Sequence, residues 1–266
     1  MRIRITLLLL LSLIGTKVHS QVNIMGKPGY INTPSAEWFV EKPLGFSFSY
    51  VPNEYSLFNH QEDLNEINFY NVRADFTSFM SVNLSLAYRP DRSSRIGVGD
   101  RQLDFRFKIL KESKYLPVLV LGWTPPGTRL PILAHDYIVA TKNFETSIGT
   151  IQWSAGYGSP YVFTRNARQD NTFWKSLKVR DKREEYGNDY LYGFFSAVSY
   201  KPVSFVGITA EYDSNSLNAG AFIQPWEWLI LQGTTYEGKE FAFSAALNFS
   251  LDFLPNSLRK DEKAQD

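Results

Sequence analysis

The sequence predicts an all-β protein, more specifically an antiparallel up-and-down transmembrane β-barrel of about 12 strands. Three observations predict it: long segments of alternating hydrophobicity, a secretory signal at the start, and connections that alternate between short and long. The composition agrees, because 15% of the residues are aromatic, as is typical of strands. After the signal, no stretch offers the ~20 consecutive apolar residues that a transmembrane helix needs.

Residues 1–20 have the pattern of a cleaved secretory signal. A basic start with Arg2 and Arg4 precedes a leucine-rich core, and Ser20 lies before the expected cleavage point. Removing this segment, which also holds Lys17, leaves 25 basic residues beside 27 acidic ones. This near-neutral charge gives no support to nucleic-acid binding. The absence of cysteine excludes disulfides, thiolate metal sites and a lipidated cysteine.

The rest of the chain divides into three parts. Residues 21–42 are dense in glycine and proline, which predicts a turn-rich periplasmic segment that leads into the barrel. The barrel is expected over residues 43–254. Residues 255–266 are polar and charged, and we expect a disordered periplasmic tail there.

Twelve segments are rich in strand-forming residues and are bounded by Gly, Pro, Asn or charged residues. The last one, Phe241–Phe253, alternates strictly between large apolar and small or polar side chains. Because successive strand side chains point to opposite faces, this predicts apolar side chains toward lipid and polar ones toward the lumen. The other eleven are Gly45–Tyr50, Glu66–Phe76, Met80–Tyr88, Gln102–Ile109, Tyr115–Trp123, Ala134–Lys142, Ser147–Tyr157, Tyr190–Tyr200, Ser204–Asp213, Leu217–Ile223 and Trp226–Tyr236.

The connections between these segments form two groups. Bacterial outer-membrane barrels have short periplasmic turns and longer external loops. Long external loops are predicted at Pro52–Asn65, Arg89–Asp100, Thr124–Leu133 and Gly158–Asp189, with two short ones near Ser214 and Gly238. Tight periplasmic turns are predicted at Thr77–Phe79, Lys111–Lys114, Asn143–Thr146, Lys201–Val203 and Gln224–Pro225. A soluble β-sandwich has no reason to separate its loops in this way.

Residues suited to catalysis are scarce. Only His60 and His135 remain after removal of the signal, and His135 and Asp136 face opposite ways if they lie in a strand. The sequence has no nucleophile elbow, phosphate-binding loop or zinc-protease helix. We therefore expect no enzyme, no cofactor and no metal site.

Two groups of residues are candidates for binding. In two predicted strands, charged residues alternate with apolar ones and are expected to point into the lumen: Asp104, Arg106, Lys108, Glu211 and Asp213. They either pair with one another and fill a small interior, or contact a solute. The long connection Gly158–Asp189 mixes basic and aromatic residues that suit an anionic glycan: Arg165, Arg168, Trp174 and Lys178. A solvated loop is the main expectation for this connection, and a loop folded inward as a plug is the alternative.

Three stretches, in order along the chain, resemble the YjbH family of exopolysaccharide-associated outer-membrane proteins. They are Gly29–Ala36, with the sequence GYINTPSA; Leu116–Trp123 followed by Gly127 and Tyr137–Lys142; and Glu211-Tyr212-Asp213 followed by Asn218-Ala219-Gly220. The resemblance implies an outer-membrane β-barrel linked to secretion or assembly of extracellular polysaccharide, with no catalytic residues to carry over. Many relatives are longer and some are lipoproteins, whereas this chain has one barrel's length and no cysteine.

The functional expectation combines the barrel and the resemblance. It is a non-catalytic outer-membrane protein in exopolysaccharide or capsule secretion or surface assembly. Its expected partners are outer-membrane lipid, extracellular polysaccharide and periplasmic export or assembly proteins, and not nucleic acid. The alternatives are a general porin or small-solute channel, a barrel hydrolase, and a soluble secreted β protein.

Overall fold

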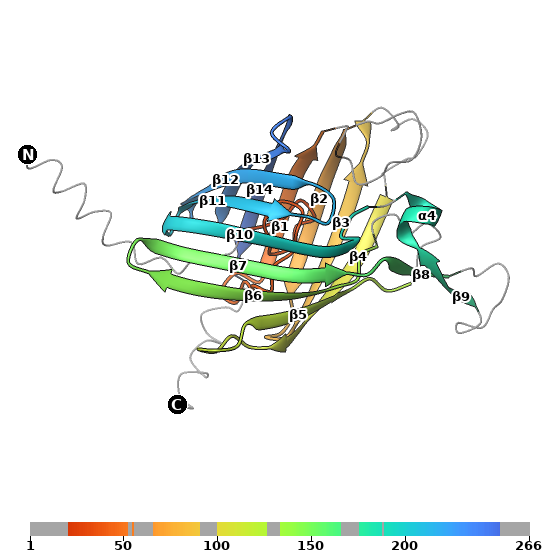
Figure 1. The fold of residues 1–266 in the computed structure, drawn as a ribbon, viewed down its shortest axis with the longest axis horizontal. Helices are drawn as coiled ribbons and strands as arrows, with labels where there is room; N and C mark the ends of the chain where they lie inside the picture. The colour runs from red at the N-terminus through yellow and green to blue at the C-terminus, as the bar shows by residue number, and fades with distance from the viewer. Residues whose placement is uncertain are drawn as a thin grey trace, which may run out of the picture.

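The structure, a computed structural model, is a closed β-barrel of twelve antiparallel strands (Figure 1). It describes residues 21–52, 55, 66–90, 100–126, 134–165, 176–187 and 189–250. Neighbouring barrel strands follow one another along the chain, and the first strand pairs with the last, which closes the barrel. The barrel strands are β1 (Leu44–Val51), β2 (Ile67–Asp75), β3 (Met80–Tyr88), β4 (Asp100–Leu110), β5 (Val118–Trp123), β6 (Tyr137–Thr146), β7 (Gly149–Gly158), β10 (Gly193–Val203), β11 (Val206–Tyr212), β12 (Leu217–Trp226), β13 (Leu229–Tyr236) and β14 (Glu240–Phe249).

The two faces of the barrel differ because the strands alternate. In β4, the side chains of Gln102, Asp104 and Arg106 are buried inside, while Leu103 is 42% exposed on the outer face. The outer face around the wall is rich in exposed apolar and aromatic side chains, whereas the inner face is mixed. It carries buried polar and charged residues and also an apolar cluster, including Ile67, Phe69 and Val120, that packs with residues of the N-terminal segment. The predicted fold class and the number of strands are confirmed.

The strand boundaries differ from the prediction at a few places. The turn between β6 and β7 lies at residues 147–148 rather than 143–146, because β6 continues in register with β7 to Thr146. Pro117 lies just before β5, outside its ladder, where a missing N–H does no harm. The register shifts of β10 and β12 fall around Pro202 and Pro225. Residues 251–253 of the last predicted strand lie outside the described residues.

The long connection between β7 and β10 is more ordered than the predicted solvated loop. It contains the hairpin of β8 (Tyr161–Arg165) and β9 (Leu177–Asp181), followed by the short helix α4 (Lys182–Tyr186). Asp181 caps α4 by accepting hydrogen bonds from the N–H groups of Arg183 and Glu184, and Gly187 ends it with φ +56°. In Figure 1 these elements lie beyond one end of the barrel. No helix within the described residues is long and apolar enough to cross a membrane.

Residues 21–36 of the turn-rich segment lie within the barrel, whereas a periplasmic lead-in segment is the expectation from the sequence. Figure 1 shows them as the orange-red trace inside the barrel, and every residue from Gln21 to Ala36 is buried. Residues 37–42, which lead to β1, are less buried, and Val40 is 72% exposed. The physical reason is that the polar groups of the inner wall need hydrogen-bond partners, which this segment supplies. The expected signal (1–20) and all of the expected tail (255–266) lie outside the described residues.

The packing of Gly122 against Tyr137 gives a prediction for barrel stability. A Cβ at Gly122 would lie 2.2 Å from Tyr137 Cε1, because the ring lies across the neighbouring strand. Gly122→Ala should therefore destabilise the barrel by about 1–3 kcal/mol in urea unfolding. Gly233→Ala is the matched control, since a Cβ there meets nothing within 4 Å. Equal stability of the two variants would contradict this packing.

Candidate functional site: a plugged lumen

We call residues 21–36 the plug. Its chain makes two compact turns, joined by a hydrogen bond from Ile24 N to Ile31 O of 2.9 Å. In the first turn, the Asn23 side chain accepts hydrogen bonds from the N–H groups of Met25 and Lys27. In the second, Tyr30 N donates to Thr33 O at 2.9 Å. The segment therefore satisfies part of its own main chain and leaves the rest for the barrel wall.

Gly26 is at the tip of the first turn, where only glycine fits. Its φ is +75°, in the left-handed region, and a Cβ there would lie 2.3 Å from Asn71 Cβ on β2. Around this tip, the side chains of Asn71 and Asn83 donate hydrogen bonds to the carbonyls of Ile24 and Met25. Side chains of the wall thus form hydrogen bonds with main-chain groups of the plug.

Glu211 on β11 forms the densest contact with the plug. Its carboxylate accepts hydrogen bonds from the main-chain N–H groups of Ile31, Asn32 and Thr33 at 2.8–3.0 Å, and one from Thr33 Oγ1 at 2.7 Å. Asp213, just beyond the end of β11, accepts a further bond from Asn32 Nδ2 at 2.5 Å. Successive N–H groups in a turn form a concave anion site, and here a wall carboxylate occupies it.

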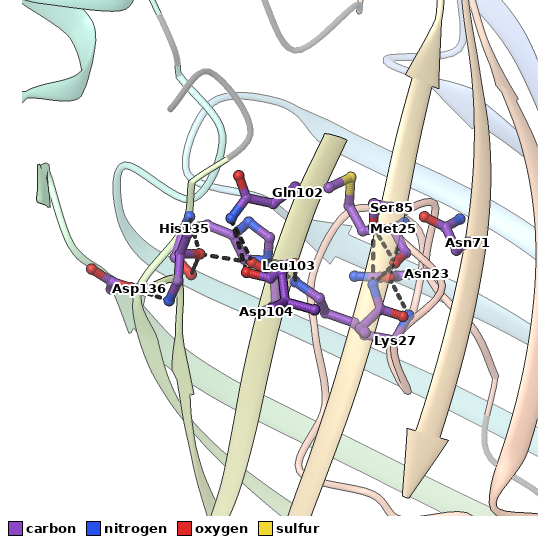
Figure 2. A network of polar contacts seen from close by, with 12 residues as sticks. Asn23, Met25, Lys27, Asn71, Ser85, Gln102, Leu103, Asp104, His135 and Asp136 are labelled. Carbon is purple, nitrogen blue, oxygen red and sulfur yellow. Dashed lines mark hydrogen bonds and ion pairs between the residues drawn. The ribbon is translucent and has the colours of Figure 1, made fainter. Parts of the chain in front are cut away.

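Lys27 makes the buried ion pair of the plug (Figure 2). Its Nζ lies 2.7 Å from Asp104 Oδ2 on β4 and also contacts His135 Nε2, and all three side chains are almost fully buried. Burial lowers the pKa of Lys27 below its usual range, and the charge of Asp104 partly opposes this. Thr124 Oγ1 donates to the other carboxylate oxygen of Asp104 at 2.7 Å.

Arg106 and Lys108 on β4 hold the end of the plug and the residues after it. Arg106 NH2 donates to Ser35 O at 2.6 Å and to Glu37 O at 3.1 Å. Lys108 Nζ lies over the Trp38 ring, 4.5 Å from its centroid, as expected for a cation–π contact. The charged side chains of β4 therefore contact the end of the plug and the residues that connect it to β1.

The connection between β7 and β10 also contacts the plug. The Tyr190 hydroxyl donates to Asn32 O at 2.7 Å, and the Tyr190 carbonyl accepts from Lys182 Nζ of α4 at 2.7 Å. Burial raises the pKa of Tyr190 well above its usual range, so the hydroxyl keeps its proton. The hairpin and helix beyond the barrel are thus linked to the plug through Tyr190.

The structure brings most of the predicted lumen residues into one site. Asp104, Arg106, Glu211 and Asp213 are buried and bond to the plug, whereas Lys108 is half-buried. The candidate glycan residues are not gathered in the same way. Arg165 and Lys178 lie on the β8–β9 hairpin, and Arg168, Trp174 and also His60 lie outside the described residues.

The plug itself was missed in the sequence, and so was the role of His135. The available signal was a lysine within a Gly-Lys-Pro-Gly turn, Gly26 to Gly29, whose charge has no partner nearby in the sequence. His135 and Asp136 lie just before β6 rather than in it. His135 contacts Lys27, and Asp136 accepts a hydrogen bond from Thr124 N at 2.7 Å. Within the described ranges no group of three or more His, Cys, Asp or Glu residues has the arrangement of a metal site.

Fold and site together define a twelve-stranded barrel whose lumen is filled by its own N-terminal segment. Comparison with protein families gives the family to which it belongs. The chain matches the YjbH family, described as "Exopolysaccharide biosynthesis protein YbjH", over residues 21–266, and it is a member of that family. This confirms the resemblance seen in the sequence. A search of curated proteins found no match.

The Glu211 contacts predict how the plug responds to a loss of charge. Glu211→Gln replaces a carboxylate with an amide that turns a donor toward the N–H groups of the plug. Charge-assisted hydrogen bonds contribute about 1.5–3 kcal/mol, so amide hydrogen exchange of residues 31–33 should rise by at least about tenfold. Glu145→Gln, an exposed residue of β6, is the control and should leave these rates unchanged. Slow exchange in both variants would contradict the role of Glu211.

Lys182 predicts a pH dependence. Burial lowers the pKa of Lys182 to about 8, so the folded state disfavours its charged form. Below pH 8 the charged Lys182 destabilises the folded state by ~3 kcal/mol at most. This destabilisation is lost as the pH rises toward the ordinary lysine pKa of about 10.4, because the folded state releases the proton first. Urea unfolding should therefore show wild-type stability rising from pH 7.5 to 9.5 relative to Lys182→Met. Lys178→Met, at an exposed position of β9, should follow the wild-type profile.

Proposed function

We propose that this protein is a non-catalytic outer-membrane β-barrel that acts in the secretion or surface assembly of extracellular polysaccharide. The observation that carries the proposal is a closed barrel, apolar outside and filled inside, in a chain of a family described by exopolysaccharide biosynthesis. The family supplies the link to polysaccharide, and the two faces of the barrel supply the link to the membrane.

The outer face supports a position in a lipid bilayer. Apolar side chains cover it from end to end, including Phe243 at 54% exposure and Ile208 at 58%. Aromatic side chains lie near both ends of the wall, as in the interfacial belts of membrane barrels. Trp123, Tyr157 and Tyr212 lie at the end with the long loops, and Trp226 and Trp228 lie at the end with the tight turns. A soluble barrel would place polar side chains at these positions.

The interior supports a role without catalysis. Asp104, His135 and Glu211, which have the chemistry of acids and bases, are all engaged with the plug. A general base needs to reach the proton of a bound substrate, and these side chains are covered by protein. The same filling of the lumen argues against a general porin, which needs an open aqueous channel.

The two ends of the barrel suggest which partners it meets. The tight turns, together with the signal that implies export, face the periplasm in this proposal and would contact export or assembly proteins there. The β8–β9 hairpin faces outward, toward extracellular polysaccharide. It presents Tyr161 and Phe163 at 52% and 44% exposure, with Arg165 at its end.

The proposal is tested by locating the protein and then deleting it. We expect the native protein in the outer-membrane fraction, with a gel migration that changes on heating as closed barrels do, and a deletion strain with reduced surface polysaccharide. Complementation with wild type should restore the polysaccharide, and His135→Ala should still restore it at least partly if no catalysis is involved. Unchanged surface polysaccharide in the deletion strain would contradict the proposed role.

A further inference from the structure

Gln21, the first residue of the plug, lies inside the lumen. It is only 1% exposed. Its Oε1 accepts a hydrogen bond from Thr209 Oγ1 on β11 at 3.0 Å, and its main-chain carbonyl accepts one from Gly29 N at 2.9 Å. Its Nε2 is buried and has no hydrogen-bond partner among the described residues. The side chain is thus held by its oxygen, while its nitrogen is buried at a cost in free energy.

Signal cleavage after Ser20 would place a charge at this position. This step belongs to the proposed function, and the inference rests on it. Cleavage turns the main-chain nitrogen of Gln21 into the α-amino group of the mature chain, which has an ordinary pKa near 8 and is therefore largely charged at neutral pH. An ammonium group buried in the lumen is costly unless an anion pairs with it. The two groups that donate hydrogen bonds to Gln21, the Thr209 hydroxyl and the Gly29 main-chain amide, bring no negative charge to this residue.

We propose that Gln21 is converted to pyroglutamate, so that the mature chain begins with a neutral lactam inside the barrel. The uncharged α-amine attacks Cδ of its own side chain. A bond forms between the α-nitrogen and Cδ, the bond between Cδ and Nε2 breaks, and Nε2 leaves as ammonia with one proton from the α-nitrogen. The reaction consumes no oxidant, reductant or other reactant.

The two ends of the side-chain amide fit this change. The atom that leaves is Nε2, which is buried without a partner, and the atom that remains is the oxygen, which accepts from Thr209. The conversion therefore removes an unsatisfied donor and the charge of the new chain end, and the lactam retains an oxygen that can accept a hydrogen bond. Ring closure needs a free α-amine, so it follows signal cleavage.

The test is intact-mass and N-terminal peptide analysis of the protein purified from the membrane fraction. We expect a chain that begins at residue 21 and is lighter than the unmodified chain by the mass of one ammonia. Gln21→Asn is the matched control: it keeps a side-chain amide, but the shorter chain cannot form an unstrained lactam, so its mass should show no such loss.

The outcomes separate this inference from the proposed function. A chain that begins with unmodified Gln21 overturns pyroglutamate formation and leaves the exported barrel intact. A chain that begins at another position after signal removal also overturns the inference alone. A chain that retains residues 1–20 overturns both the inference and the proposed export.

Discussion

A barrel wall that is apolar outside must place its polar side chains inside, and those side chains then need partners. This constraint determines most of the structure. Removing one member of a buried charge pair costs about 3–5 kcal/mol, because the other charge is left without compensation. Without the plug, Asp104 would be such a charge in a dry lumen, and Lys27 compensates it. Glu211 would lose the hydrogen bonds that it accepts from the N–H groups around Asn32, so the wall and the plug stabilise each other.

The same constraint explains why the contacts with the plug are spread around the wall. Seven strands each contribute a side chain that forms a hydrogen bond or ion pair with the plug. These are Asn71 of β2, Asn83 of β3, Asp104 of β4, Thr141 of β6, Ser154 of β7, Glu211 of β11 and Gln232 of β13. Many of these bonds go to main-chain groups, which any sequence of the same shape would offer. Other contacts depend on the identity of plug residues: Tyr30, Asn32 and Thr33 hydrogen-bond to the wall through their side chains, Lys27 supplies a charge, and Gly26 adopts a conformation that other residues rarely adopt. A movement of the plug would have to break contacts on most sides at once.

The hairpin beyond the barrel adds a connection that bears on function. Lys182 and Tyr190 link α4 to the plug, so a ligand that displaces the hairpin would also act on Asn32. In the proposed role, polysaccharide is met at this end of the barrel. The plug is therefore in contact with both the wall and the outer elements, and it is not an independent domain.

The sequence predicts the wall well because strand alternation is a local signal. Phe241–Phe249 shows it strictly, and the inward positions of Asp104, Arg106 and Glu211 follow from the parity of their strands. The partners of these charges could not be predicted in the same way, because glycine and proline in residues 21–42 indicate turns but not their location. The β8–β9 hairpin was missed because Tyr161–Thr164 alternates over too few residues to stand out.

Electrical conductance tests most directly whether the plug closes the lumen. The purified wild-type protein, reconstituted in planar bilayers, should pass no steady ion current, because the plug bonds to the wall on most sides. A variant lacking residues 22–36 serves as the positive control, since the polar wall would then line an aqueous channel. A sustained current through the wild-type protein would contradict the account, because it would show an open path past the plug.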